Sequence, residues 1–411
     1  MTTLFSGGLL FDGEQAPIDG QGVLVESGRI TEVAPRAEFD GFAGTEVDTA
    51  GATLLPGLID CHVHFCLGGE ADPGTAADKL SAAGTGLKAL ERAQATLRGG
   101  VIGVRDCGGR DFIELEVRDA IGAGSFTGPT VKASGRVICM TGGHGARMGR
   151  VADGVDDVVK AVRENIHAGA DVIKIMATGG VMTPGVNPED AHYSADEMAA
   201  GIAEAQRFSR STASHAQGAE GILNAVRGGV TSIEHGIFMD ERCLEEMLAA
   251  GTYLVPTLSA VANIIEHRDK GIPSWAVEKA ERVLERHKES FKAYHQAGGR
   301  IAMGTDAGTP FNKHGENAQE LRYMVENGMK PVDALRSSTR IAADLCELAD
   351  NGRIAVGLAA DFLVVEGNPA QDIKQVADQA NHRLVVKNGA PAAGAAKLAG
   401  GLAKIEAAAS F

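Results

Sequence analysis

The chain has 411 residues, of which 44% are hydrophobic and 23% charged, and its 39 Lys plus Arg against 54 Asp plus Glu give a net charge of −15. This charge disfavours nucleic acid or an anionic membrane as a partner, because either would need a basic surface. No apolar run reaches the ~18 residues of a membrane span, no basic leader is present at the start, and the six cysteines form no CxxC pair, so we expect a cytoplasmic protein with reduced thiols.

The two ends of the chain predict short antiparallel strands. Residues 1–55 hold apolar runs separated by turn signals, as in LLFDGEQAP and GVLVESGRITEVAP, and residues 353–395 return to this pattern. We therefore expect 1–55 and 353–395 to pair into one small β-sandwich module. The Ala-rich segment 396–411 is expected to form a terminal helix or a loose tail.

Between these ends, residues 56–352 alternate short apolar runs with helical stretches. The helical stretches include 156–169, 194–209, 219–229, 240–251 and 275–298. The eight apolar runs lie at 57–65, 100–108, 129–137, 171–180, 210–218, 230–236, 252–257 and 300–308. Eight strands alternating with helices predict an α/β fold, a parallel (β/α)8 barrel whose chemistry lies at the C-terminal ends of the strands.

Histidines stand where three of these runs end. His62 and His64 are two residues apart, so on a strand they face the same side and present two nitrogens to one ion. Alternatively, His62 and His64 could be ordinary strand histidines, one exposed and one buried. His215 and His235 close adjacent runs 20 residues apart. Each alone could be a capped loop histidine, but four histidines at strand ends favour a metal site.

Two further residues fit the same site. Asp306 ends the eighth run and could ligate metal through one oxygen and accept a proton through the other, although a lone Asp in a Gly-rich loop is often a turn residue. Lys174 stands inside an apolar strand, where a desolvated ammonium is costly. The strand pleat alone leaves its direction open. Carboxylation by CO2 would give it two anionic oxygens able to bridge two cations.

This ordered set resembles the amidohydrolase superfamily over essentially the whole chain. Within it, the chain is similar to the branch of prolidase-like and arginine-carboxypeptidase-like dipeptidases, with ochratoxin- and phenylurea-cleaving relatives. The segments that carry the resemblance are LLPGLID at 54–60, HVH at 62–64, VRDCGG at 104–109, TGGHG at 141–145, VADGVDDV at 151–158, KIMATGGV at 174–181, HAQG at 215–218, IEHG at 233–236 and GTDAG at 304–308.

The resemblance implies a binuclear metal centre. It implies one divalent ion held by His62, His64 and Asp306, and a second held by His215 and His235. Carboxylated Lys174 and a hydroxide would bridge the two ions. Zinc is the expected metal, and the same ligands also suit manganese or cobalt. The bridging hydroxide would attack an amide carbonyl, and Asp306 would pass the water's proton to the leaving nitrogen.

Four residues are candidates for contact with a small-molecule substrate. His144 follows the third strand, where similar enzymes keep a histidine near the oxyanion; otherwise it is a surface histidine. Tyr193 stands where relatives keep a tyrosine and could equally serve loop packing. Arg105 could bind a substrate carboxylate or pair with an acid of the fold. Gln217, in HAQG, departs from the HAYT-like stretch of the dipeptidases, whose aromatic residue meets the substrate carboxylate.

These observations favour a hydrolase that cleaves an amide bond of a dipeptide or an N-acyl amino acid. The HAQG stretch keeps aryl ureas, carbamates, aryl amides and lactones open as alternative substrates. A non-catalytic scaffold on the same fold is a remote alternative, because none of the six ligand positions is missing. By analogy we also expect a homo-oligomer.

Overall fold

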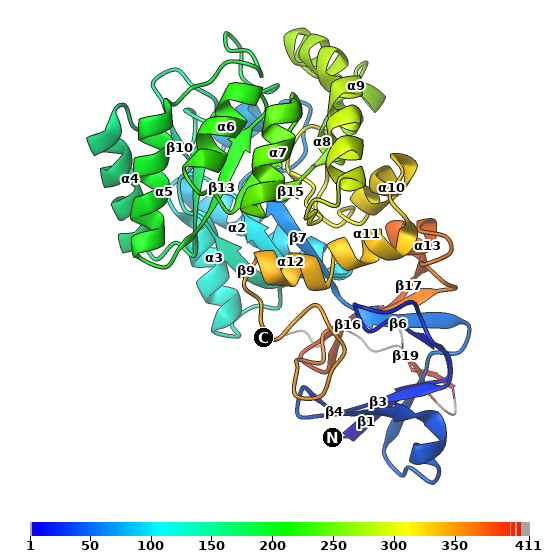
Figure 1. Ribbon diagram of the computed structural model, residues 1–411. Helices are drawn as coiled ribbons and strands as arrows, with labels where there is room; N and C mark the ends of the chain where they lie inside the picture. The colour runs from blue at the N-terminus through cyan, green and yellow to red at the C-terminus, as the bar shows by residue number, and fades with distance from the viewer. Residues whose placement is uncertain (1, 395, 399–400, 404–411) are drawn as a thin grey trace.

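The computed structural model describes residues 2–394, 396–398 and 401–403. Figure 1 shows two connected parts, one rich in helices and the other built mainly of strands. The earliest and latest strands of the chain lie together in the second part. Among the described residues, no helix is both long enough and apolar enough to cross a membrane.

The strand-rich part consists of two facing sheets. Its strands are β1 (Thr2–Ser6), β2 (Leu9–Leu10), β3 (Gln21–Glu26), β4 (Arg29–Pro35), β5 (Thr45–Asp48), β6 (Ala52–Pro56), β16 (Phe362–Glu366), β17 (His382–Lys387), β18 (Ala390–Gly394), β19 (Ala396–Leu398) and β20 (Gly401–Ala403). One sheet has the order β20-β19-β5-β1-β3-β4 and the other β18-β17-β16-β6-β2. Phe5 and Phe362 meet edge to face between them, their ring centroids 5.3 Å apart. The expected sandwich of both chain ends is therefore present.

The described part of the C-terminal segment differs from the expectation. Residues 396–398 and 401–403 form strands β19 and β20, and Leu398 of β19 pairs with Val47 of β5. The expected helix or loose tail is wrong for these six residues, because the sheet edge beside β5 offers backbone hydrogen bonds that an isolated tail lacks. Residues 395, 399–400 and 404–411 lie outside the described residues.

The central part carries parallel strands in chain order. These are β7 (Leu58–Val63), β8 (Val101–Asp106), β9 (Thr130–Ala133), β10 (Ile138–Cys139), β11 (Arg150–Val151), β12 (Val172–Met176), β13 (Ser211–Ala216), β14 (Ser232–His235) and β15 (Tyr253–Val255). They form a β7-β8-β9 sheet and a β11-β10-β12-β13-β14-β15 sheet. Seven of the eight runs predicted from sequence thus contain a parallel strand, and the α/β fold class is confirmed.

The eighth run, 300–308, is not a regular strand. It lies between β15 and β7 and joins them through single bridges, Leu254 with Ile301 and Val63 with Ala307. Gly304 explains the close approach, because a Cβ there would lie 2.3 Å from Val255 Cγ1 and 3.0 Å from the His62 Cβ. The sheet ladder is therefore interrupted at the run that brings Asp306 beside the first strand.

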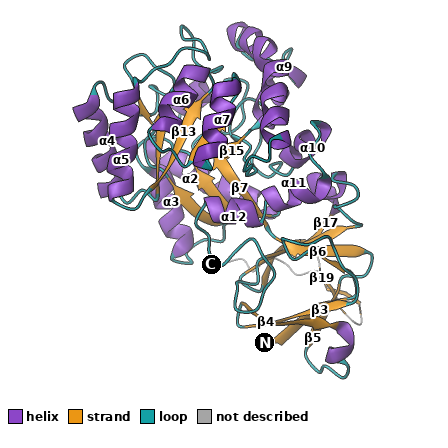
Figure 2. Cartoon of the chain, viewed as in Figure 1, coloured by secondary structure: helices purple, strands orange, loops and turns teal. Residues whose placement is uncertain are grey.

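Helices surround the parallel strands (Figure 2). They are α1 (Pro73–Asp78), α2 (Ala82–Arg98), α3 (Ile113–Gly122), α4 (Val155–His167), α5 (Ala195–Arg207), α6 (Ala219–Arg227), α7 (Glu241–Ala250), α8 (Leu258–Glu266), α9 (Ser274–Gln296), α10 (Gln319–Glu326), α11 (Pro331–Ser337), α12 (Arg340–Leu345) and α13 (Lys374–Ala377), with short 3-10 turns at Arg36–Phe39 and Gln379–Asn381. Strand and helix side chains share one large apolar core. This core keeps the strand ends rigid, and the site is built on those strand ends.

Candidate metal centre

A cavity of about 490 Å3 opens where the parallel strands end. All six metal ligands predicted from sequence line it, and so do His144 and Gln217. The cavity residues used below are His62, His64, Asp72, Ala77, Asp78, Arg110, His144, Arg147, Met148, Lys174, Met176, Val181, Met182, Thr183, His215, Gln217, His235, Ile264, Trp275 and Asp306. Residues up to 244 positions apart in the chain therefore meet around one space, as the barrel interpretation requires.

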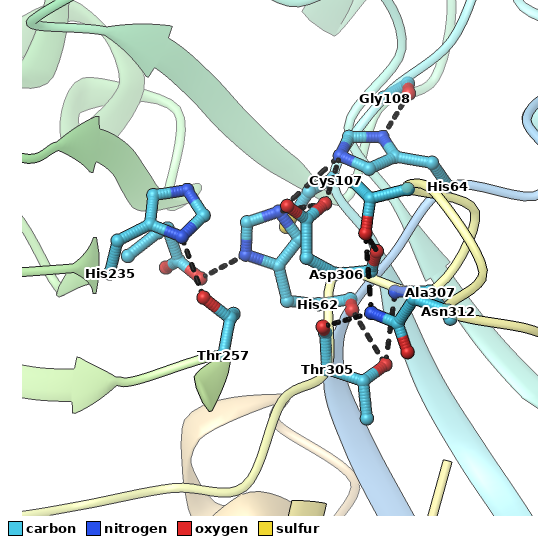
Figure 3. A network of polar contacts seen from close by, with 12 residues as sticks. His62, His64, Cys107, Gly108, His235, Thr257, Thr305, Asp306, Ala307 and Asn312 are labelled. Atoms are coloured by element: carbon cyan, nitrogen blue, oxygen red, sulfur yellow. Dashed lines mark hydrogen bonds and ion pairs between the residues drawn. The ribbon is translucent and has the colours of Figure 1, made fainter. Parts of the chain in front are cut away.

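His62, His64 and Asp306 converge on one point (Figure 3). The Nε2 atoms of the two histidines are 3.3 Å apart, and Asp306 Oδ1 lies 3.5 Å from His62 Nε2 and 3.2 Å from His64 Nε2. Ligand atoms about 2.1 Å from a tetrahedral ion lie about 3.4 Å from one another. The three atoms therefore have the spacing that a single divalent ion requires.

Hydrogen bonds to the other ring nitrogens orient both histidines. His62 Nδ1 lies 2.7 Å from Glu234 Oε2, and His64 Nδ1 lies 2.7 Å from the Gly108 carbonyl oxygen. Both acceptors require Nδ1 to carry the proton, which leaves a lone pair on each Nε2. The lone pairs thus point toward the shared space with Asp306.

His215 and His235 are oriented in the same way. His215 Nε2 lies 2.9 Å from the Gly179 carbonyl oxygen, so its lone pair is on Nδ1. The Thr257 hydroxyl donates to the Pro256 carbonyl and accepts from His235 Nδ1 at 2.6 Å, which leaves the His235 lone pair on Nε2. The two rings meet edge to face with centroids 4.5 Å apart. They form a second ligand pair beside the first.

Electrostatics keep most of these rings neutral. Burial lowers the pKa of His62, His215 and His235 well below the usual histidine value. Burial also acts to lower the pKa of His64, but the hydrogen bond and charge of Asp306 outweigh it and leave that pKa raised. Neutral imidazole is the form that ligates metal, so the histidine set suits a divalent cation.

Lys174 points into the cavity from β12, which settles the direction that the strand pattern left open. The residue is 1% exposed, and Nζ has no hydrogen-bond partner among the described residues. A buried ammonium without a partner is costly, and it would lie among four imidazoles that carry no compensating charge. A carbamate on Nζ would remove this cost and supply anionic oxygen to cations, so the position fits a carboxylated lysine.

Backbone conformation at the strand ends is unusual. His235, Thr257 and Asp306 have φ angles of +71°, +53° and +61°, in the left-handed region that residues other than glycine rarely adopt. One ligand atom each from His62, His235 and Asp306 lie within 4.8 Å of one another. Strained residues persist where the surrounding fold holds them, and here they turn two ligands toward the centre.

His144 and Gln217 complete the polar wall. The His144 ring lies 4.2 Å from the His215 ring, centroid to centroid, and its Nδ1 is 2.7 Å from the Thr183 hydroxyl. Burial lowers the pKa of His144 to about 3. Gln217 is 4% exposed, and its Oε1 has no partner within the part of the chain described. Both side chains are available to a bound molecule.

The structure corrects two predicted substrate contacts. Arg105 is 1% exposed beneath the centre, where Nη2 contacts Glu234 at 2.8 Å and Nε donates to the Cys61 carbonyl. The Tyr193 hydroxyl donates to the Ala152 carbonyl at 2.7 Å. Neither side chain lines the cavity. The alternative interpretations, ion pairing for Arg105 and loop packing for Tyr193, describe their places in the fold.

Glu234 is a functional residue that the sequence analysis missed. It is fully buried on β14 and connects His62 to Arg105. The signal was an acidic residue within the strand SIEH, directly before one of the predicted ligand histidines. A charge at such a position requires a buried partner, and here the partners are His62, a candidate metal ligand, and the Arg105 guanidinium.

Comparison with known proteins gives the family. Residues 53–391 match the amidohydrolase family model. The ochratoxinase of Aspergillus niger is 31% identical over 407 residues, covering 90% of this chain and 82% of the relative. Its crystal structure superposes with a TM-score of 0.83 at 30% identity, covering 96% of this chain and 96% of its own. The crystal structure of a Xaa-Pro dipeptidase gives a TM-score of 0.86 at 32% identity, covering 95% of this chain and 99% of its own.

These matches confirm the superfamily and the branch predicted from sequence. They extend over both the sandwich and the parallel strands, so the relation covers the cavity and its ligands. From the family match, the relatives and the ligand geometry, we conclude that the chain belongs to the amidohydrolase family and is a hydrolase acting on carbon–nitrogen bonds.

Proposed function

We propose that the protein is a binuclear metal-dependent amidohydrolase that cleaves an amide bond of a dipeptide or N-acyl amino acid. One observation carries this proposal: His62, His64 and Asp306 have the spacing of a single metal site, directly beside the His215 and His235 pair. The partnerless Lys174 Nζ supports two cations, since carbamate oxygens could serve both ligand groups. Nitrogen and carboxylate-type ligands make Zn2+ the favoured metal.

Divalent ions held there would supply a nucleophilic water at neutral pH and polarise the scissile carbonyl. The protein's own residues handle the proton and the developing charge. Asp306 directs Oδ1 at His62 and His64, so Oδ2 remains to accept a proton from water and deliver it to the leaving nitrogen. This assignment uses the two carboxylate oxygens for separate tasks.

His144 is placed to stabilise an oxyanion. Its low pKa keeps the ring neutral, and its Nδ1 can accept the hydrogen of the Thr183 hydroxyl. The ring proton then resides on Nε2, which becomes a hydrogen-bond donor. A donor of this kind in a cavity with little water stabilises negative charge that develops on a carbonyl oxygen.

The cavity walls support substrates with an apolar group beside the amide. Met148, Met176, Val181, Ile264 and Trp275 all line the space. The likeness to a Xaa-Pro dipeptidase favours dipeptides, and the likeness to an ochratoxinase favours ochratoxin-like substrates. Gln217, in place of the dipeptidase aromatic, favours a second candidate activity on aryl amides, aryl ureas, carbamates or lactones.

Metal analysis followed by a substrate screen tests the proposal. The purified chain is stripped with a chelator, reloaded with zinc, and assayed against Xaa-Pro and other dipeptides, N-acyl amino acids, aryl amides and aryl ureas. We expect two zinc ions per chain and hydrolysis of at least one amide. A fully loaded chain with one ion, or one that cleaves only ureas or esters, would contradict the proposal.

A further inference from the structure

We propose that Arg110 and Arg147 form a carboxylate-binding subsite at the cavity mouth, so that the preferred substrates are anionic. This inference rests on the proposed function and names the class of its substrate. Both arginines line the same cavity as the metal ligands. Among the described residues that line this cavity, Lys174 is the only other lysine or arginine.

Both arginines lie on loops that also carry residues of the centre. Arg110 follows two residues after Gly108, whose carbonyl accepts the hydrogen bond of His64. Arg147 follows three residues after His144. Consecutive Cα atoms are about 3.8 Å apart, so the Arg110 Cα lies at most about 8 Å from that of Gly108, and the Arg147 Cα at most about 11 Å from that of His144. An arginine on each of two loops can therefore reach a charge carried next to the scissile amide.

The two arginines share one counter-charge. Asp78 Oδ1 lies 3.1 Å from Arg110 Nη2, and Asp78 Oδ2 accepts from Arg147 Nε at 2.7 Å. The other acid of this rim, Asp72, caps helix α1 by accepting from the backbone and hydroxyl of Thr75. Asp72 also lies close enough to Arg147 to interact with its charge, so the rim holds two acids for two guanidinium groups. A substrate carboxylate would therefore take the place of Asp78 on one or both of them.

The guanidinium groups also retain hydrogen-bond donors. Each arginine has five N–H donors. In the described contacts Arg110 uses Nη1 on the Ala77 carbonyl and Nη2 on Asp78, while Arg147 Nη1 makes no hydrogen bond. Their side chains are 27% and 54% exposed, which leaves them free to reorient toward a ligand. Arginine presents two parallel donors to a carboxylate, the geometry this subsite requires.

The subsite also accounts for the HAQG stretch. Gln217 has no aromatic hydroxyl with which to meet a substrate carboxylate, so the charge must be recognised elsewhere. An apolar acyl group would lie against Met182, Ile264 and Trp275, with the carboxylate at the arginines. N-acyl amino acids and dipeptides with an apolar N-terminal residue have this pattern.

Binding without turnover tests the subsite. Trp275 is the single tryptophan of the chain and lines the cavity, so its fluorescence reports occupancy. The probes are N-tosyl-L-leucine and its neutral analogue N-tosyl-L-leucinol. Neither contains an amide carbonyl, and a carbonyl-directed hydrolase does not cleave their sulfonamide bond. With the zinc-loaded full chain, we expect the acid to bind at least tenfold more tightly than the alcohol.

Variants assign this preference to the arginines. Arg110→Gln and Arg147→Gln should each weaken acid binding about tenfold, which corresponds to about 1.4 kcal/mol, and leave binding of the alcohol unchanged. Arg136→Gln is the matched control, because Arg136 pairs loosely with Asp111 at 3.7 Å away from the cavity wall. If the double Arg110→Gln/Arg147→Gln variant kept the preference for the acid, the subsite would not exist.

Asp78→Asn provides a test that misfolding cannot imitate. Removing the competing carboxylate frees both guanidinium groups, so acid binding should tighten severalfold while binding of the alcohol stays constant. Unchanged or weaker acid binding in this variant would overturn the inference. Because neither probe is cleaved, the result is independent of whether any amide is hydrolysed, and failure of the proposed function remains a separate outcome.

Discussion

Replacing Glu234 by glutamine tests whether a buried charge holds a metal ligand in place. Glu234 Oε2 contacts His62 Nδ1 at 2.7 Å, and Oε1 accepts from Arg105 at 2.8 Å and from the Ser232 hydroxyl at 2.6 Å. Glutamine keeps the shape but removes the charge opposite a guanidinium that is 1% exposed. Removing one partner of a buried ion pair costs about 3–5 kcal/mol of stability.

The same substitution affects the metal. A glutamine that offers its amide oxygen to His62 must turn its NH2 group toward the donors of Arg105, so one of the two contacts is lost. Loss of the group that orients a ligand histidine lowers metal affinity by about 10- to 100-fold. We expect both effects in the single variant, one in the free energy of unfolding and the other in zinc binding.

Urea unfolding of the metal-free chain measures the first effect, and competition with a chelator measures the second. The double variant Arg105→Met/Glu234→Met is the control, because replacing both charges by apolar side chains should recover part of the lost stability while zinc affinity stays low. The reasoning is refuted if the free energy of unfolding of Glu234→Gln lies within about 0.5 kcal/mol of the parent value and its zinc affinity lies within about twofold of the parent affinity.

Three further outcomes follow from the site and the core. Lys174→Ala should lose at least one metal and nearly all activity, with short-chain acids restoring some of it, and an active, fully metallated variant would rule out the carbamate bridge. His144→Asn should lower kcat about 10²- to 10³-fold with metal content unchanged, and a change in KM alone would exclude an oxyanion role. Burial raises the pKa of Glu320 to about 7 from 4.5, so the folded state holds a proton that the unfolded state has released. The contribution of Glu320 to the free energy of unfolding is complete below pH 4.5 and falls by about 3 kcal/mol as the pH rises to 7. Glu320→Gln should flatten this fall when the free energy of unfolding is measured across the same pH range. An unchanged slope would contradict the assignment.

Local patterns in the sequence were sufficient for most elements and for the six candidate ligands that line the cavity. The period of the long helical stretch at 275–298 predicted α9 within two residues at either end. The two-residue spacing of His62 and His64 placed both on one side of the chain, and both line the cavity. These features depend on backbone periodicity, which neighbouring residues determine. The expected homo-oligomer and cytoplasmic location stay predictions.

Such local patterns could not predict contacts between segments that are far apart in the sequence. The sequence left Arg105 as a possible substrate ligand. In the folded chain Glu234, 129 residues later, lies beside it and accepts a hydrogen bond from it. The eighth run was predicted to be a strand. Its backbone lies so close to His62 at Gly304 that it joins its neighbours through single bridges instead of a regular series of strand hydrogen bonds. In each case the partner lies on an element that only the folded chain brings close.

The linear chain was enough to establish the class of fold and the residue types of the candidate metal centre, because strand and helix periods and the order of the strand-end histidines and acid are properties of the chain itself. The tertiary structure alone decided that Lys174 points inward, that Glu234 supports His62, and that Arg110 and Arg147 share Asp78. The physical reason is that the direction and charge environment of a side chain are set by packing between elements far apart in the sequence, which no local period records.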